Sequence, residues 1–480
     1  MTISLSPRSG GAPTAPLPTN AARRAVTTAP PPVTVRPWWR DLTGVLTWST
    51  MLFVVALWVY GGGVQQLNSF ASAANSLGRL TGLVASDLLL IQVLMMARVP
   101  MFERAYGQDE LARRHRLIGF TSFNLMWAHI VLIVIGYASA QWSQLWSTIV
   151  DLVLNYPAML LAVAGTVALC MVVSTSVKKA RGKLRYESWH LIHLYGYLGA
   201  GLALPHQLWT GTDFMNNTAA TVFWWGLWAV TALAVLVYRV GLPLWTSWRH
   251  DLRVAGVDRL APDVVTVTVT GRDLHRFPVS AGQFFQWRFA GRGQTRAHPY
   301  SLSHAPDGRT LRITAQEVGD GTDALASLRP GTRALVEGPY GRMHDGVRTK
   351  PKVLLMGSGI GVTPLRAMFE SIPAAPGDVT LIYLAGCDAH LLWADELQAI
   401  ARQRGARVFF VTGRRAERGG WLPQNVAHLD DVGALRHLVP DVAQHDVFVC
   451  GSNGWMNAVE QTLTAAGVPD AQVHIERFSY

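Results

Sequence analysis

The sequence predicts a multidomain protein in which a six-helix transmembrane bundle is followed by an antiparallel β-barrel domain and then by an α/β domain with a parallel sheet. Two observations predict this fold class. First, 50% of the 480 residues are hydrophobic and only 15% are charged, which is too apolar for a chain of soluble domains. Second, the long apolar stretches lie before Val240, whereas short β-type runs separated by Gly, Asp and Pro begin after Arg249.

Six apolar stretches are each long enough to cross a hydrocarbon core of about 30 Å as a helix. They lie at Gly44–Gly63, Leu80–Ala97, Leu117–Tyr137, Pro157–Val177, Trp189–Leu208 and Ala219–Val240. Lys and Arg gather in the linkers 98–116 and 178–185 and are absent from the linkers 137–157 and 207–220. Because cytoplasmic loops carry the excess of positive charge, we expect a multi-pass plasma-membrane protein with its N-terminus and its C-terminal domains in the cytosol.

The expected domain boundaries follow from where the apolar stretches end and the short β-type runs begin. The bundle occupies 38–245, the β-barrel domain 246–348 and the α/β domain 349–480, and residues 1–37, rich in Pro, Ala, Thr and Ser, form a disordered cytosolic tail. The strands expected in the two cytosolic domains are Val264–Thr270, Phe284–Phe289, Thr310–Ala315, Val353–Met356, Val379–Leu384, Val408–Val411 and Val447–Cys450.

Charge and cysteine content exclude several classes of protein. The net charge of +11 comes from basic residues beside apolar segments and is not accompanied by a nucleic-acid motif, so membrane orientation explains it and nucleic acid is not an expected partner. The three cysteines show no CxxC spacing. Disulfide frameworks and cysteine-ligated iron–sulfur clusters are therefore not expected.

Ligand-capable histidines gather on two of the expected spans. The third span has His115 and, fourteen residues later, His129; about 3.9 helical turns separate them, so both project from nearly one face, roughly 21 Å apart. The fifth span has His193 and His206, thirteen residues apart, which a regular helix does not place on one face unless Pro205 distorts it. Because both spans run outward, His115 pairs in depth with His193 and His129 with His206. Four histidines at matched depths predict two stacked haems, each with two axial histidines.

Other polar residues of the spans leave alternatives open. Hydrogen bonds between helices are the competing interpretation of the four histidines. We expect His190 at the interface or at a haem propionate and not on iron. Asp87 fits either a proton path or a carboxyl that is turned into the bundle and hydrogen-bonded. Arg79 fits an interface anchor, a steering charge for an anionic acceptor, or a partner of a propionate.

Two short motifs in the cytosolic half suit cofactors. His298-Pro-Tyr-Ser301 follows a strand, and Gly319-Asp-Gly-Thr322 comes later; an aromatic ring on a flavin, with hydroxyl and backbone groups at its phosphates, is the chemistry they suggest. In Leu354–Pro364 a buried strand runs into three glycines, and Pro364 stands where a helix begins, so backbone amides are available to a pyrophosphate. A tight turn without a ligand is the competing interpretation, because the glycines do not follow GxGxxG.

Together these motifs resemble the ferredoxin–NADP reductase type of flavin and nicotinamide module fused to a ferric-reductase transmembrane domain, as in the superfamily of NADPH oxidases and ferric chelate reductases. The resemblance covers about residues 44–480. It implies b-type haems on the four membrane histidines, FAD at the first pair of motifs and a nicotinamide nucleotide at the glycine-rich segment. The cofactor residues that it implies are His298, Pro299, Tyr300, Ser301, Gly319, Gly321, Thr322, Gly357, Ser358, Gly359, Ile360, Gly361, Thr363, Pro364 and Gly451.

The resemblance also implies residues near the position of hydride transfer. Val449-Cys-Gly-Ser452 is similar to the family's strand-end motif, which implies a catalytic role for Cys450. The terminal Glu476–Tyr480 is similar to a motif whose aromatic ring covers the isoalloxazine; Phe478 matches that ring, and two extra residues leave Tyr480 open. The competing interpretations are a small buried cysteine and an aromatic side chain that docks on the sheet.

Arg414 and Arg415 follow a strand of the α/β domain and are placed to meet a 2′-phosphate. The pair therefore favours NADPH over NADH as the donor. A solvated arginine pair, with NADH as donor, is the competing interpretation.

The sequence thus predicts electron transfer from cytosolic NADPH through FAD and two haems to an external one-electron acceptor. Because histidine fills both axial positions, outer-sphere reduction is expected, and both dioxygen, which gives superoxide, and ferric chelates fit. The outer linkers show no siderophore-like segment, which favours dioxygen. The alternatives are delivery of electrons to quinone or to a partner protein, and a haem-free flavin reductase anchored by structural helices. Beyond the bilayer and the small acceptor no partner is indicated, and no EF-hand loop is present.

Overall fold

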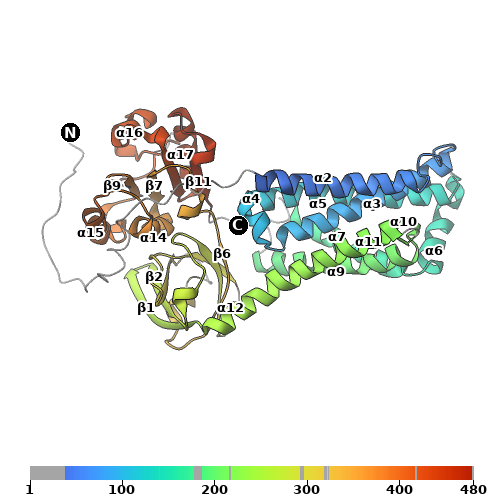
Figure 1. The fold of residues 1–480 in the computed structure, drawn as a ribbon, viewed down its shortest axis with the longest axis horizontal. Helices are drawn as coiled ribbons and strands as arrows, with labels where there is room; N and C mark the ends of the chain where they lie inside the picture. The colour runs from blue at the N-terminus through green and yellow to red at the C-terminus, as the bar shows by residue number, and fades with distance from the viewer. Residues whose placement is uncertain are drawn as a thin grey trace. The chain divides into compact units, whose positions relative to one another are not determined.

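The computed structural model describes residues 38–477 except 140, 178–185, 216–217, 292–296, 318–321, 323, 417–418 and 427. The described chain divides into two compact units between Gly241 and Leu242. Figure 1 shows that one unit is made of helices and the other combines strands with helices. The tail expected at 1–37 lies outside the described residues, as do Gly319, Gly321, Phe478 and Tyr480.

Six long helices lie among the described residues of the first unit. They are α2 (Trp38–Tyr60), α3 (Phe70–Met96), α5 (Gln108–Tyr137), α7 (Met159–Ser176), α9 (Tyr186–Trp209) and α11 (Thr218–Ala234). The connections contain α4 (Pro100–Tyr106), η1 (Trp142–Gln144), α6 (Leu145–Asn155) and α10 (Thr212–Met215). A π-helical segment, η2 (Val235–Gly241), continues α11 into α12 (Leu242–His250).

Five helical stretches of the described chain are long and apolar enough to cross a membrane. They are Asp41–Tyr60, Phe70–Met96, Glu110–Tyr137, Met159–Ser176 and Thr218–His250. The span expected at Trp189–Leu208 is present as the helix α9, which is not among these five. Histidines, Pro205 and Gln207 make α9 more polar than its neighbours, so its composition does not identify it as a span. The first unit is therefore a multi-pass membrane-type region with five apolar helices, and the sixth span stays a prediction.

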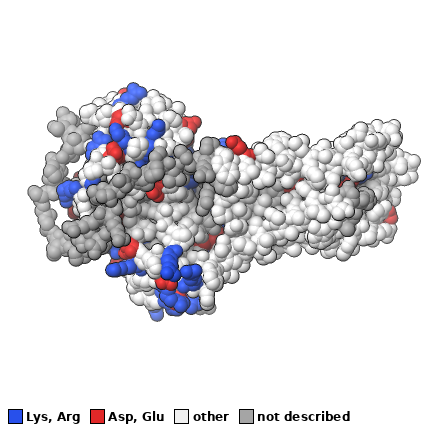
Figure 2. Space-filling model, in the orientation of Figure 1, with Lys and Arg blue, Asp and Glu red and all other residues white. Residues whose placement is uncertain are grey.

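Glycines allow these helices to approach one another closely. A Cβ on Gly165 of α7 would lie 2.8 Å from the carbonyl oxygen of Gly199 in α9, and a Cβ on Gly199 would lie 2.9 Å from Cγ of Leu169. Contacts between small residues are typical of helix association in lipid, where burying larger apolar side chains gains little. The visible face of the helices in Figure 2 shows almost no charged side chains, as a lipid-facing surface requires.

The second unit begins with α12, which packs on one of two antiparallel sheets. One sheet has the order β1 (Arg253–Ala261), β2 (Val264–Thr270), β5 (Thr310–Gln316), and the other has the order β4 (His298–Ser301), β3 (Phe284–Phe289), β6 (Ala334–Tyr340). Inward side chains of both sheets share one core that includes Val267, Trp287 and Ile313. The short β-type runs of the sequence, which are bounded by Gly, Asp and Pro, predicted β2 and β3 with the observed bounds. A closed barrel stays a prediction.

A five-stranded parallel sheet forms the rest of the second unit. Its order is β11 (Val473–Glu476), β10 (His445–Cys450), β7 (Lys352–Ser358), β8 (Val379–Ala385), β9 (Arg407–Thr412). Helices α14 (Val362–Ser371) and α15 (Ala394–Arg404) cover one face, and α16 (Asp431–Leu438) and α17 (Asn453–Ala465) cover the other. Short turns of 3-10 helix are η3 (Leu274–Arg276), η4 (Ala324–Ser327), η5 (Asp345–Val347), η6 (Gly359–Gly361), η7 (Asp388–His390), η8 (Gln424–Val426), η9 (Val442–Gln444) and η10 (Asp470–Gln472). This is the doubly wound strand order, in which the first strand lies between the second and the fourth.

Candidate functional site

The four membrane histidines come from two helices of the first unit. His115 and His129 lie on α5, and His193 and His206 lie on α9. The ring centroids of His115 and His193 are 6.0 Å apart with an angle of 63° between the ring planes. His129 is an electrostatic neighbour of His206, so the outer two histidines lie in the same region of the bundle. The structure thus places His115 beside His193 and His206 in the neighbourhood of His129, the two pairs that matched in depth along the sequence.

Three of these imidazoles are held through Nδ1. His115 Nδ1 is 3.1 Å from the carbonyl oxygen of Gln92, and His129 Nδ1 is 2.7 Å from that of Gly78. A carbonyl oxygen only accepts hydrogen bonds, so in both rings Nδ1 carries the proton and Nε2 keeps its lone pair. His193 Nδ1 is 3.3 Å from Oγ of Ser176 in α7. Such a bond at one ring nitrogen is the usual partner of a metal bond at the other.

The geometry of the inner pair fits a haem. Histidine nitrogens bind metal ions at about 2 Å, so two axial ligands on opposite sides of an iron place their ring centroids roughly 6 Å apart. The observed 6.0 Å between His115 and His193 agrees with this spacing. In the outer pair, Nδ1 of His206 is buried and makes no hydrogen bond of good geometry among the described residues, and its nearest backbone partner is Ala203, one turn earlier on α9.

Groups that support the histidines were not identified from the sequence. Gly82 faces His129 so closely that a Cβ would lie 2.5 Å from Nδ1 of the ring. Trp189 donates to Ser176 Oγ over 3.2 Å and its ring lies 4.9 Å from that of His193. The available signal was the spacing of Gly78 and Gly82, which forms a GxxxG pattern of close helix packing on α3.

Two ionisable residues of α3 have protein partners. Asp87 is fully buried and accepts a hydrogen bond of 3.2 Å from Thr50 in α2, while its Oδ1 has no partner among the described residues. Arg79 forms an ion pair with Asp213 in α10 through Nε, at 2.7 Å, and through a second guanidinium nitrogen, and it donates to Gln66 over 2.8 Å. Its guanidinium is thus engaged by the protein.

The glycine-rich segment forms the turn between β7 and α14. Gly359 has a φ of +57°, which favours glycine, and a Cβ on Gly361 would lie 2.4 Å from the carbonyl oxygen of Cys450. Helix α14 begins at Val362. The helix start that was expected at Pro364 therefore lies two residues too late. Thr363 donates to the carbonyl oxygen of Ile360 over 2.9 Å. The N–H of Val362 already bonds to the carbonyl oxygens of Gly359 and Ile360 and Pro364 has no N–H, so this helix start offers a pyrophosphate fewer amides than a regular one.

The strand-end motif meets this turn at the switch point of the sheet. Cys450 on β10 is paired with Gly357 on β7, at the edge where ligands bind in open α/β sheets. Cys450 is fully buried, and burial, followed by the nearby Glu476 carboxylate, raises the pKa of its thiol well above the usual value. The thiol is therefore neutral. A Cβ on Gly451 would lie 3.0 Å from Cβ of Ser358, so the two segments touch.

The arginine pair separates into two environments. The guanidinium of Arg415 lies over Gly454, where a Cβ would come within 2.7 Å of its nitrogens, at the start of α17. The backbone of Arg415 forms an isolated antiparallel β-bridge with that of Pro423. Both arginines are exposed, and the carbonyl oxygen of Arg414 accepts from Gln424 N over 2.7 Å. Arg415 lies beside a helix N-terminus, where an anion is favoured.

The expected flavin motif is the short strand β4. It pairs with β3, with Ser301 opposite Phe284 and Tyr300 opposite Phe285. The hydroxyl of Ser301 is buried without a hydrogen-bond partner among the described residues, which suits a polar group of a ligand. Burial raises the pKa of Tyr300, and its ring stacks 6.1 Å from that of His298. Pro299 stands opposite Gln286, and of the second motif only Thr322 is described.

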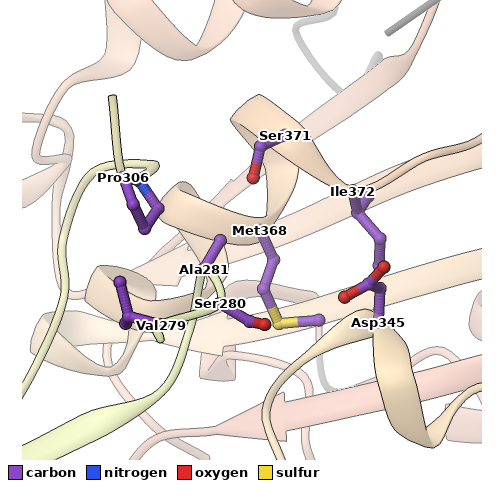
Figure 3. Close-up of a pocket in the computed structure, with 8 residues that line it drawn as sticks. All are labelled: Val279, Ser280, Ala281, Pro306, Asp345, Met368, Ser371 and Ile372. Carbon is purple, nitrogen blue, oxygen red and sulfur yellow. The ribbon is translucent and has the colours of Figure 1, made fainter. Parts of the chain in front are cut away.

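A cavity of about 200 Å³ lies within the second unit, away from these motifs (Figure 3). It opens between loops of the β domain and the C-terminal half of α14, whereas the glycine-rich turn is at the N-terminal end of that helix. The lining residues are Val279, Ser280, Ala281, Pro306, Asp345, Met368, Ser371 and Ile372.

Two family models match the chain. Residues 81–204 match the ferric reductase like transmembrane component, and residues 355–461 match the oxidoreductase NAD-binding domain. The first match includes all of α5 and reaches Leu204 of α9, one residue before Pro205. The second begins within β7 and ends within α17, so it contains both the glycine-rich turn and Cys450.

About half of the chain is similar in sequence to characterised reductases. Ferredoxin–NADP reductase B of Sorangium cellulosum is 28% identical over 48% of this chain and 97% of that protein. An NADPH oxidoreductase of Mycobacterium tuberculosis is 26% identical over 49% of this chain and 62% of that protein. The ferredoxin reductase component of a 3-ketosteroid-9-alpha-monooxygenase from Mycolicibacterium smegmatis is 32% identical over 48% of this chain and 65% of that protein. The chain thus spans less than two thirds of the last two.

A solved ferredoxin NADP+ reductase from Neisseria gonorrhoeae with bound FAD and NADP is 20% identical over 48% of this chain and 98% of that chain, with a TM-score of 0.40. The matches to the two family models come from different units of the chain. The protein is accordingly a transmembrane oxidoreductase and flavoprotein that uses FAD and NAD(P)H. It joins a ferric reductase-like transmembrane domain to an FAD- and NAD-binding oxidoreductase domain and so matches a ferric reductase/NADPH oxidase-type fusion.

Proposed function

We propose that this protein is an NADPH oxidase of the plasma membrane. It passes electrons from cytosolic NADPH through FAD and two b-type haems to dioxygen on the opposite face, where superoxide is released. The N-terminus and the second unit lie in the cytosol, because the Lys- and Arg-rich linkers 98–116 and 178–185 belong to the cytosolic side. The domain division 38–245, 246–348 and 349–480 is part of this proposal.

The observation that carries the proposal is the setting of the four histidines. The rings of His115 and His193 are 6.0 Å apart, which leaves room for a metal ion between them. Because Nδ1 of His115 and of His129 carries the proton, Nε2 of each ring is free to bind a metal. His115 and His193 would hold the inner haem, and His129 and His206 the outer. Held by two histidines, haem iron accepts and gives up single electrons without an open coordination position.

In the second unit, the residues bind and orient the donor. The turn Gly357–Pro364 would hold the nucleotide pyrophosphate at the start of α14, and Arg415 would meet a 2′-phosphate beside α17, which makes NADPH the donor. The β4 strand, with the buried hydroxyl of Ser301, would hold FAD. Cys450 would border the nicotinamide as a neutral thiol, because burial keeps it protonated. FAD converts the two-electron donor into single-electron steps.

Electrostatics on the outer side supports dioxygen as the acceptor. The linkers 137–157 and 207–220 contain no Lys or Arg. The guanidinium of Arg79 is engaged by Asp213 and Gln66. An anionic ferric chelate would be concentrated by a positive surface, whereas dioxygen is neutral and needs none. The outer surface therefore favours the small neutral acceptor.

The test is an anaerobic visible spectrum of the purified chain in detergent with FAD, before and after NADPH, followed by air. We expect sharp reduced b-type bands after NADPH, and their loss in air together with dye reduction that superoxide dismutase suppresses. Two variants sharpen the test. His129→Ala should lose the outer haem, whereas His190→Ala, a histidine of the same helix as His193 that is not expected on iron, should keep both haems.

Ferric chelate reduction is the second candidate, and the match of residues 81–204 to a ferric reductase like component favours it. In that case the reduced bands persist in air and disappear when a ferric chelate is added. Slow oxidation by both small acceptors would point to delivery of electrons to quinone or to a partner protein. An absence of haem bands, or full activity in His129→Ala and His206→Ala, would instead support a haem-free flavin reductase and contradict the proposal.

A further inference from the structure

Arg366 lies inside the second unit and does not belong to either cofactor motif. It stands on α14, five residues after Gly361, on the helix that begins at the glycine-rich turn. Its side chain has no exposed surface. Burying a guanidinium is unfavourable unless it is paired, so its partners indicate what it does.

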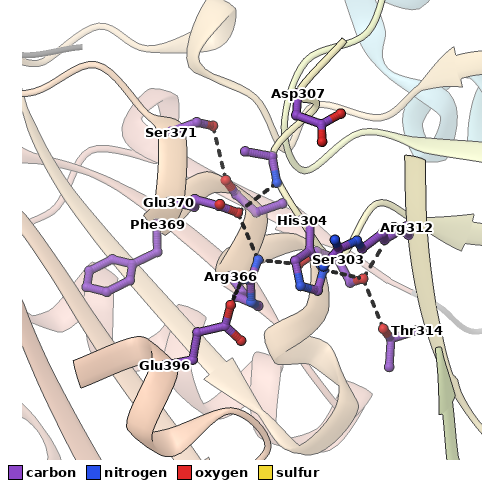
Figure 4. A network of polar contacts seen from close by, with 12 residues as sticks. Ser303, His304, Asp307, Arg312, Thr314, Arg366, Phe369, Glu370, Ser371 and Glu396 are labelled. Carbon is purple, nitrogen blue, oxygen red and sulfur yellow. Dashed lines mark hydrogen bonds and ion pairs between the residues drawn. The ribbon is translucent and has the colours of Figure 1, made fainter. Parts of the chain in front are cut away.

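Those partners join two segments that are far apart in the sequence (Figure 4). One guanidinium nitrogen donates to the carbonyl oxygen of Ser303 over 3.0 Å and to Glu370 over 2.9 Å. The other forms an ion pair with Glu396 of α15. The guanidinium carbon lies 5.6 Å from the ring centroid of Trp393. Three acceptors in different directions use the planar fork that arginine provides and lysine does not.

Ser303 is the important partner because of its place in the chain. It comes two residues after Ser301, the last residue of β4 and of the expected flavin motif. Its backbone N donates to the carbonyl oxygen of Arg312 over 2.9 Å, and Thr314 donates to its hydroxyl over 2.9 Å, so Ser303 is fixed to the β domain.

Glu370 makes a second connection beside the first. The carboxylate oxygen that accepts from Arg366 also accepts from the backbone N of Ala305 over 2.9 Å. Arg366 and Glu370, four residues apart on α14, thus hold one helix face to the chain segment 303–305. The middle and the end of α14 and the segment after β4 are consequently connected through a short set of directed, charge-assisted bonds.

We propose that Arg366 is a positioning residue for hydride transfer: it holds α14, which carries the nucleotide turn, at a fixed distance from β4, which carries the flavin motif. The inference rests on the proposed function of these two motifs. In the step concerned, NADPH gives up a hydride and becomes NADP+, and oxidised FAD accepts that hydride and becomes the reduced anionic flavin. The transfer needs close and aligned reactants, and a displacement of about 1 Å can cost roughly 100-fold in rate.

The test compares Arg366→Met with Arg404→Met in the full-length protein. Arg404 is also buried in part and binds the same helix, through the carbonyl oxygens of Phe369 and Ile372, but it makes no contact with the segment 303–305 in the described structure. Flavin bleaching by NADPH is followed by anaerobic stopped flow across a range of NADPH concentrations. This separates the limiting rate of hydride transfer from the dissociation constant of NADPH.

We expect the limiting rate in Arg366→Met to fall by roughly 10- to 100-fold, with a dissociation constant within about 3-fold of wild type, and Arg404→Met to keep a limiting rate within about 3-fold. Arg366→Lys should recover only part of the rate, because the three donors of an ammonium sit on one nitrogen and cannot reach acceptors that are divided between two guanidinium nitrogens. If Arg366→Met does not retain FAD, the lysine variant and Glu396→Gln serve the same comparison.

A limiting rate in the Arg366 variants that is unchanged, or that falls only as far as it does in Arg404→Met, overturns the proposal. Failure of the proposed function has a different signature, because in that case NADPH does not bleach the flavin of the wild-type protein at all.

Discussion

At the scale of single residues, Gly82 determines how His129 is held. The imidazole of His129 lies so close to this glycine that a Cβ would come within 2.5 Å of Nδ1 and 3.0 Å of Cγ. Nδ1 is also the atom hydrogen-bonded to the carbonyl oxygen of Gly78. A side chain at position 82 would therefore displace the ring or break that bond, and overpacking of this kind costs about 1–3 kcal/mol.

On the proposed assignment of two haems, we predict that Gly82→Ala disturbs the outer haem and spares the inner one. A spectroelectrochemical titration should show that one of the two haem transitions is lost or shifted. Gly201→Ala on α9 is the matched control, because nothing lies within 4 Å of a Cβ at that position. Since alanine favours helix over glycine by up to about 1 kcal/mol, this control should keep both haems and be at least as stable as wild type. Two unaltered transitions in Gly82→Ala would show that the ring does not depend on this space.

His304 gives a prediction about pH. It follows Ser303 and packs edge-on against Trp393 with 5.9 Å between ring centroids. Burial, followed by the charges of Arg366 and Arg312, lowers the pKa of His304 to about 2. An unfolded chain binds a proton here below about pH 6.5, whereas the folded chain does not until about pH 2. The free energy of unfolding therefore falls as the pH drops below about 6.5, by at most about 1.4 kcal/mol per pH unit from this group.

The measurement is the temperature at which FAD fluorescence is released, at pH 7.5 and at pH 5.5. Wild type should lose more thermal stability between these two pH values than His304→Gln, which cannot take up the proton. Equal losses in both proteins would mean that the imidazole is protonated in the folded state or that other groups control the acid sensitivity.

The candidate ligand residues could be predicted from the sequence, whereas the groups that orient them could not. His115, His129, His193 and His206 are unusual in apolar segments and therefore stand out. The carbonyl oxygens of Gly78 and Gln92 carry no such signal, because every residue has one. Arg366 and Ser303 are 63 positions apart, and only the folding of α14 against the β domain brings them together. The roles of the predicted site residues stay predictions, including those of Phe478 and Tyr480 outside the described chain.

At the scale of elements, α3 organises the helical unit. Its carbonyl oxygens hold two imidazoles of α5, its Asp87 is bound by α2, and its N-terminal half is connected to α10 through Arg79 and Asp213. The side chains of Arg79 and Asp213 are 24% and 11% exposed, so the pair is largely removed from solvent. Removing one partner would leave the other charge buried and unpaired, which is costly, whereas removing both is not.

We predict from this that Arg79→Gln and Asp213→Asn each lower the thermal stability of the purified protein, and that the double variant recovers most of the loss. The coupling energy should be about 1–3 kcal/mol. Arg113→Gln is the control, because Arg113 is 72% exposed and pairs with Glu110 on the helix surface, where such pairs contribute about 0.5 kcal/mol or less. If Arg79→Gln instead leaves stability unchanged and slows only the reduction of anionic acceptors, Arg79 acts as a steering charge.

Strong periodicity made some elements predictable and its absence hid others. The expected strands of the α/β domain appear as β7, β8, β9 and β10, each within two residues of the predicted bounds, because buried parallel strands are continuous apolar runs. Strand β1 was missed because several of its residues are exposed or half-buried, so its sequence shows no alternation. Strand β4 is four residues long and contains a proline, which usually argues against a strand.

At the scale of the whole molecule, one continuous helical stretch runs from Thr218 to His250 and belongs to both units. Its last segment, α12, is part of the second unit by its contacts. Ser247 accepts a hydrogen bond of 3.1 Å from Val336 N on β6, and His250 Nδ1 is 2.8 Å from the carbonyl oxygen of Arg272. Both side chains are only 4% exposed. A folding boundary therefore lies before α12 and not after it.

The last prediction concerns fragments of the chain. The Sorangium reductase is matched over 97% of its own length by about half of this chain, which indicates that a module of this kind can fold by itself. We predict that a fragment of residues 242–480 binds FAD and reduces an artificial dye with NADPH in the absence of haem. A fragment of residues 251–480 lacks Ser247 and His250 and should unfold about 2 kcal/mol more easily, which corresponds to roughly 4–8 °C in the thermal midpoint. Equal midpoints for the two fragments would mean that α12 contributes to the membrane unit alone, whereas loss of FAD from both would mean that the flavin module needs the helical unit to fold.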